Sequence, residues 1–147
     1  MEREVETEWL GNLSFESKMD VHRITVDAHP DFGGENNGPS PENLLLAALN
    51  SCAGMDITSL LQKMRVEVDK MKISATGELT SDHPRHFRTI HLVYEFSGKH
   101  LRREKIKEAV DLSQDRYCGI SHMLAKITNV TYDVIFREKQ IPLLVEQ

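Results

Sequence analysis

The chain has 147 residues, of which 39% are hydrophobic, and this size fits one domain with a buried core. A formal net charge of −5 argues against a nucleic-acid partner, because a polyanion would be repelled. The longest uncharged stretch, between Glu42 and Asp56, has thirteen residues, whereas a membrane-spanning helix needs about twenty. The charged start, MEREVETEWL, lacks the apolar segment of a secretory signal. We therefore expect a single domain over residues 1–147, cytoplasmic, with no nucleic acid and no membrane as partner.

The first third of the chain is predicted to form a three-stranded meander followed by a loop. Residues 4–9, 13–18 and 22–28 carry Val, Phe, Ile and Thr and are separated by turn residues. The next segment, DFGGENNGPSP, has the Gly, Asn and Pro content of a loop. Ser40 before Pro41 is typical of a helix start.

A long helix is predicted over residues 41–64. Its apolar side chains recur at helical spacing, and the first half is apolar nearly all round, which predicts a central helix covered on most sides. Asp56 and Gln62 lie off the expected stripe. The stripe is formed by Leu44, Ala48, Cys52 and Met55 and widened by Leu45, Leu60, Leu61 and Met64.

The rest of the chain alternates strands and helices. Residues 66–78 and 86–96 predict a long hairpin, because apolar side chains alternate along both. Helical spacing returns over residues 102–114, and a short helix over 118–127 precedes a last strand over 130–136. The order βββ-α-ββ-α-α-β indicates an α+β fold with largely antiparallel sheets.

Two cysteines, Cys52 and Cys118, lie 66 positions apart. In a reducing compartment such thiols are buried, metal-bound or redox-active more often than paired in a structural disulfide. Cys52 lies too far into its helix for the helix dipole to activate its thiol. The alternative to a reactive thiol is that Cys52 is simply a small side chain of the core. Cys118 follows a predicted helix break, where free N–H groups would favour the thiolate.

Two further side chains are candidates for the same chemistry. Glu42 lies in the first turn of the long helix, about 15 Å of helical rise before Cys52, where a carboxylate also simply complements the helix dipole. His122 follows Cys118 by four residues, a spacing that metal ligands also use. Zinc would need Cys52 and a fourth ligand as well, so we expect no metal and no cofactor.

Two segments carry a resemblance to a known family. GGENNGPSPENLLLAALNSCAGMDI and AVDLSQDRYCGISHML resemble the two signature segments of the OsmC/Ohr family, the osmotically inducible and organic-hydroperoxide-resistance proteins. The resemblance covers the whole chain and implies an intertwined homodimer, in which antiparallel sheets from both chains wrap around long central helices.

The resemblance also implies a function. In the enzymes of this family the first cysteine attacks a small hydroperoxide, and the second condenses with the resulting sulfenic acid. Carried over, Cys52 is the peroxidatic thiol and Cys118 the resolving thiol, and a dithiol reductant restores both. Glu42 matches the family carboxylate that orients an arginine beside the first thiol. The implied activity is a thiol-dependent peroxidase that reduces organic hydroperoxides.

One residue of the family pattern is missing. The activating arginine normally lies in the first hairpin, where this chain has WLGNLSF and no arginine between Arg3 and Arg23. Arg23 or Arg116 are candidates to replace it, from either chain of a dimer. The departure favours a divergent branch and leaves two alternatives: a non-catalytic small-molecule-binding or redox-sensing protein, and a structural dimer whose thiols are merely buried.

Overall fold

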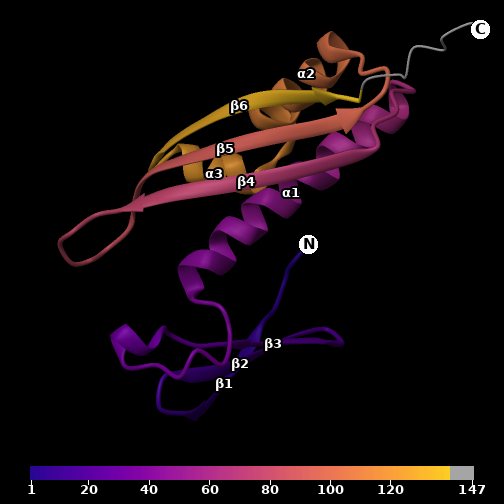
Figure 1. Ribbon diagram of the computed structural model, residues 1–147. Helices are drawn as coiled ribbons and strands as arrows, with labels where there is room; N and C mark the ends of the chain where they lie inside the picture. Colours follow the sequence, from indigo (N-terminus) through magenta and orange to yellow (C-terminus); the bar gives the residue numbers. More distant parts are fainter. Residues whose placement is uncertain (140–147) are drawn as a thin grey trace, which may run out of the picture. The chain divides into compact units, whose positions relative to one another are not determined.

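The computed structural model describes residues 1–139, and the chain forms two compact units, Met1–Leu45 and Leu46–Gln147. The prediction of one domain stays a prediction, because compact units describe packing and not independent folding. The α+β class is confirmed, with two three-stranded sheets (Figure 1). The strands and helices are β1 (Glu6–Gly11), β2 (Ser14–Met19), β3 (His22–Val26), α1 (Pro41–Lys63), β4 (Lys70–Leu79), β5 (Phe87–Gly98), α2 (Arg103–Leu112), α3 (Gly119–Ala125) and β6 (Asn129–Glu138).

The first unit contains the predicted meander. Its strands pair antiparallel in the order β1-β2-β3, so that Phe15 lies opposite Trp9 on one side and Val26 on the other. The connecting turns contain Asn12 and Asp20 at φ 46° and 53°. Asn and Asp tolerate this left-handed region better than other non-glycine residues, which gives the predicted turns a local cause.

The loop after β3 is organised around a buried carboxylate. Asp27, which is 2% exposed, accepts hydrogen bonds from the backbone N–H groups of Asn37 (3.1 Å), Ala28 (2.7 Å) and Glu35 (3.3 Å). The hydroxyl of Ser14 donates to the same carboxylate at 2.9 Å. These donors, that of Asn37 first, outweigh the effect of burial and lower the pKa of Asp27 below its ordinary value of 3.8.

Two positions in this loop require glycine for steric reasons. A Cβ on Gly34 would lie 1.9 Å from the carbonyl oxygen of Ala28, and one on Gly38 would lie 2.0 Å from that of Thr25. Both contacts are with backbone atoms, which cannot rotate away as a side chain can. The loop therefore passes against β3 at a distance that only glycine allows.

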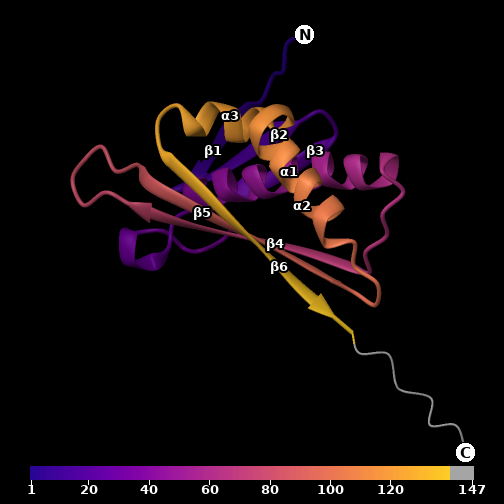
Figure 2. The same ribbon diagram turned by 90° about the horizontal axis from the view of Figure 1, so that it is seen from above.

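The second sheet departs from the expected antiparallel arrangement. Its order is β4-β5-β6; β4 and β5 form the predicted antiparallel hairpin, but β6 runs parallel to β5 (Figure 2). A parallel neighbour requires the chain to return to the starting end of β5, and the segment with α2 and α3 makes this return. Three of the four described strand pairs are antiparallel, as expected, and the pair β5-β6 is the exception.

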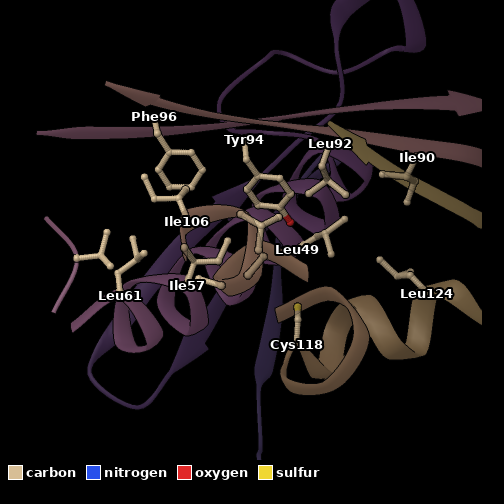
Figure 3. Packing of buried hydrophobic residues seen from close by; sticks show 14 residues of the cluster. Leu49, Ile57, Leu61, Ile90, Leu92, Tyr94, Phe96, Ile106, Cys118 and Leu124 are labelled. Carbon is tan, nitrogen blue, oxygen red and sulfur yellow. The ribbon is translucent and has the colours of Figure 1, made fainter. Parts of the chain in front are cut away.

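The hydrophobic core of the second unit lies between this sheet and its helices. Figure 3 shows the inward side chains of β5 pointing toward side chains of α1, α2 and α3. Alternate residues of β5 are fully buried, as the period of a half-covered strand requires. The β5 residues are Ile90, Leu92, Tyr94 and Phe96, and the helical ones include Leu49, Ala53, Ile57, Leu61, Ile106, Val110 and Leu124.

The buried stripe of α1 differs from the predicted one. Leu49, Ala53, Ile57 and Leu61 are buried at steps of four, whereas Met55 is 73% exposed. The helix has apolar side chains on more than one face, so periodicity alone could not decide which face packs on the sheet. The other apolar face remains uncovered in the single chain.

By length and composition α1 could cross a membrane, since an 18-residue window has a mean hydropathy of 1.5. This differs from the expectation that no helix is long and apolar enough to span a membrane, which rested on the length of the longest uncharged stretch of the chain. Such a helix is weak evidence for a membrane span, because the core helix of a globular domain meets the same test. Because its buried stripe packs in the core with β5, we interpret α1 as a core helix.

Candidate functional site

The two cysteines, far apart in sequence, lie together in the fold. Both thiols are free, and the sulfurs of Cys52 and Cys118 and a carboxylate oxygen of Asp56 all lie within 4.8 Å of one another. Cys52 and Asp56 come from α1, where a separation of four residues places two side chains on the same side of the helix. Cys118 comes from the turn before α3.

The position of Cys118 follows from a helix break. A π-helical segment, Ser113–Tyr117, ends α2, and Cys118 then takes an extended conformation as the residue that caps α3. Its sulfur accepts a hydrogen bond from the backbone N–H of Ser121 at 3.4 Å. The predicted break is therefore confirmed, and it turns the thiol into the core (Figure 3).

Hydrogen bonds hold this turn from several sides. The N–H of Cys118 donates to the carbonyl of Ser113 at 2.8 Å. The hydroxyl of Ser121 donates to Gln114 Oε1 at 2.7 Å, and the Nε2 of the same glutamine donates to the hydroxyl of the fully buried Tyr94. The side chain of Gln114 thus connects the central strand of the sheet to the turn that carries Cys118.

The surroundings of Cys118 disfavour its thiolate. Burial raises the pKa of the Cys118 thiol to about 11; the N–H of Ser121 lowers it, and Cys52 and Asp56 raise it further. The expected help from the helix N-terminus is present as the Ser121 hydrogen bond, but burial outweighs it. The N–H group acts in the predicted direction, but burial, which the sequence did not reveal, leaves the pKa of Cys118 above its ordinary value.

The remaining predicted residues lie outside the group of the two thiols and Asp56. Glu42 is exposed in the first turn of α1, in the first compact unit. His122 is exposed on α3, and among the described residues the metal-ligating atoms that cluster are those of Cys52, Asp56 and Cys118. Cys118 precedes α3 in an extended conformation, so Cys118 and His122 do not both belong to this helix.

Both arginines considered as replacements have other partners. Arg23 forms an exposed ion pair with Glu16 at 2.6 Å. The guanidinium of Arg116 lies over the ring of Tyr117, 5.6 Å from its centroid. Neither interaction involves a cysteine.

Asp56 is the site residue that sequence reasoning missed. The sequence reading placed it off the apolar stripe of α1, as an ordinary polar position. Its spacing of four residues from Cys52 was the available signal, because that spacing shares a helix face. One of its oxygens, Oδ2, is buried without a hydrogen-bond partner among the described residues.

A groove of about 590 Å³ opens between α1 and β4. Its lining includes Asn50, Gly54, Met55 and Ile73 but neither cysteine. The thiol site and this groove are therefore separate features of the second unit.

Comparison with known proteins agrees with this arrangement. Residues 34–133, a range that includes both cysteines and Asp56, match the sequence profile of a family described as OsmC-like protein. The chain belongs to the OsmC-like family. The resemblance drawn from the two cysteine segments is thereby confirmed.

Two relatives of this OsmC-like protein are similar over nearly their whole length. Protein YhfA of Escherichia coli strain K12 is 32% identical over 130 residues, which cover 86% of this chain and 94% of YhfA. The crystal structure of a hypothetical protein from Aquifex aeolicus VF5 has a TM-score of 0.80 and 32% identity, covering 94% of this chain and 99% of that one.

A more distant structure shares the fold. An organic hydroperoxide resistance protein OsmC from Legionella pneumophila has a TM-score of 0.71 at 15% identity, covering 92% of this chain and 97% of its own. At this identity the likeness shows the OsmC fold alone.

Proposed function

We propose that this OsmC-like protein is a thiol-dependent peroxidase that reduces organic hydroperoxides through Cys52 and Cys118. The observation that carries the proposal is the approach of two free thiols to within 4.8 Å from segments 66 positions apart in the sequence. A relative with the same fold is named an organic hydroperoxide resistance protein, which supports the choice of substrate.

The chemistry needs two thiols and an external reductant. The Cys52 thiolate attacks the O–O bond of ROOH; that bond breaks, a proton goes to the leaving oxygen, and Cys52–SOH and ROH result. The Cys118 thiol then condenses with the sulfenic acid, which forms the disulfide and releases water. A dithiol supplies two electrons and two protons to restore both thiols. A cytoplasmic location fits this need for reducing conditions.

Exposure supports the assignment of the two roles. Cys52 is half-buried, so a peroxide can reach it, whereas Cys118 is 2% exposed and meets only a neighbouring group. The sulfurs must approach from their present separation to a bond of about 2.0 Å, which requires side-chain rotation. Glu42 enters the proposal from the family resemblance alone, as the carboxylate that would orient a cationic group near Cys52.

A homodimer is part of the proposal. All described buried hydrophobic residues belong to Leu46–Gln147, so the sheet of Met1–Leu45 has apolar side chains but no buried apolar core of its own. Trp9 is 68% exposed, and α1 leaves Met55 uncovered. A second copy would cover such surfaces, whereas a lone three-stranded sheet is rarely stable without packing. A mass of two chains in light scattering is expected; a stable monomer would contradict it.

A redox sensor without turnover is the second candidate. The observation that favours it is the raised pKa of Cys118, because a reluctant resolving thiol prolongs the life of a Cys52 sulfenic acid. A sensor is expected to oxidise stoichiometrically, whereas a peroxidase consumes many equivalents of peroxide.

The deciding experiment measures consumption of cumene hydroperoxide with a dithiol reductant. Multiple turnovers are expected for the native chain, none for Cys52→Ser, and accumulation of a trappable sulfenic acid for Cys118→Ser. Turnover that survives Cys52→Ser, or oxidation of the native chain that stops at one equivalent, would overturn the peroxidase proposal.

A further inference from the structure

The cluster of Cys52, Asp56 and Cys118 contains one more group than a disulfide needs. A carboxylate oxygen of Asp56 completes a triangle with the two sulfurs, all within 4.8 Å. Two thiols alone suffice for the peroxidase chemistry proposed above. The carboxylate therefore has no part in that reaction as written, and its place needs another explanation.

The Asp56 carboxylate is also incompletely satisfied. Oδ2 is inaccessible to solvent and accepts no hydrogen bond, and Asp56 forms no ion pair with any residue in the described range 1–139. A buried carboxylate oxygen without a donor costs free energy, which a bound cation would remove. The incompletely satisfied carboxylate and the two sulfurs together offer three donor atoms to a cation.

We propose that the reduced protein binds one Zn²⁺ ion through Cys52 Sγ, Cys118 Sγ and the Asp56 carboxylate. Two sulfurs and one oxygen form a donor set that suits zinc, which is a borderline soft cation, and does not suit Mg²⁺ or Ca²⁺. Tetrahedral zinc holds sulfur at about 2.3 Å, so two sulfurs on one ion lie about 3.8 Å apart. The atoms lie within 4.8 Å of one another, so the sulfurs need to approach by at most about 1 Å, which side-chain rotation can supply.

Three protein ligands leave the fourth tetrahedral position open. Sites with three protein ligands bind water or a substrate there, whereas structural zinc sites are closed by four. The half-buried position of Cys52 gives the site access from solvent. Binding requires neither peroxide nor turnover, so this inference goes beyond the proposed function and does not depend on it.

Zinc binding and disulfide formation exclude each other. In oxidation by diamide, the two sulfurs give two electrons to the reagent, which takes two protons from solution and becomes its hydrazine. The S–S bond forms, and the ion leaves as Zn²⁺ because its two sulfur ligands are gone. Zinc would therefore protect the reduced thiols, and oxidation would release it.

The test uses the full-length chain without a tag, reduced with a phosphine and freed of metal. Titration with zinc chloride alone is expected to load one ion per chain in native mass spectrometry and to block alkylation of both cysteines. Diamide is expected to release the ion to a chromogenic chelator. Failure of hydroperoxide turnover would leave these results unchanged, so the two proposals fail separately.

Variants identify the ligands. Asp56→Asn keeps the shape of the side chain and is expected to weaken zinc affinity by at least the roughly 10- to 100-fold that loss of an outer-shell partner costs. Cys52→Ser is expected to remove stoichiometric binding, and the exposed Glu67→Gln serves as the matched control with unchanged affinity. Zinc that binds Cys52→Ser and Asp56→Asn as tightly as the native chain, or native folded protein that binds none, would overturn the proposal.

Discussion

The carboxylate of Asp56 lies within 4.8 Å of the Cys118 sulfur and raises the pKa of that thiol. In the family pattern a positive charge lies beside the first cysteine, which corresponds to Cys52, and would stabilise a thiolate there. At the second cysteine, Cys118, burial and the Asp56 carboxylate act in the opposite direction and disfavour the thiolate.

Asp56→Asn is expected to make Cys118 more reactive. Loss of the negative charge lowers the pKa of Cys118, although burial keeps it above its ordinary value. Each unit of pKa decrease raises the thiolate fraction at neutral pH about tenfold. The measurement is the rate of Cys118 alkylation against pH, followed by peptide mass spectrometry in the presence of a chelator. The same rate profile in Asp56→Asn and in Glu67→Gln would contradict this prediction.

The helices and strands, and the two cysteines as candidate site residues, could be predicted from the sequence. The three-stranded meander, the start of α1 at Pro41 and the break before Cys118 all have local causes in turn residues, capping residues and spacing. Local causes act within a few residues, so they can be read from the sequence alone.

The rest depends on contacts between distant segments. Periodicity showed that α1 is apolar but could not tell that Leu49 rather than Met55 faces the sheet. The parallel pairing of β6 with β5 depends on the path of the chain through two helices. Asp56 becomes a site residue only because the turn of Cys118 packs against its helix, and such a contact leaves no local signal.

Cys52 is expected to be alkylated before Cys118 in the native protein. Cys52 is half-buried, whereas Cys118 is 2% exposed and has its pKa raised to about 11, so both access and ionisation slow its reaction. A time course with iodoacetamide at neutral pH, read by mass spectrometry, gives the order. In the unfolded protein, which is the control, both cysteines should react faster and at equal rates. Equal alkylation rates of the two cysteines in the native protein would contradict the prediction.

Asp27→Asn is expected to destabilise the first unit and to make its stability depend less on pH in the acid range. The folded-state pKa of Asp27 is lowered, so its stabilising effect is present above its ordinary value of 3.8 and is lost as the pH falls through the lower, folded value. The single tryptophan, Trp9, lies in this unit and reports on it by fluorescence. Acid unfolding is compared with that of Asp82→Asn, which changes an exposed loop residue. A native-like acid transition in Asp27→Asn would show that the loop does not depend on this carboxylate.

Gln114→Ala is expected to loosen the turn of Cys118 from the core. The substitution removes the hydrogen bonds to Tyr94 and Ser121 and leaves the fully buried Tyr94 hydroxyl without a partner, which costs about 1–3 kcal/mol. Urea unfolding should show this loss of stability, and native-state alkylation of Cys118 should accelerate because the turn opens more often. Gln62→Ala, at an exposed position of α1, controls for the loss of a glutamine side chain. A loss of stability without faster Cys118 alkylation would mean that the turn is held by its remaining hydrogen bonds, among them that from the Cys118 N–H to the carbonyl of Ser113, and not by Gln114.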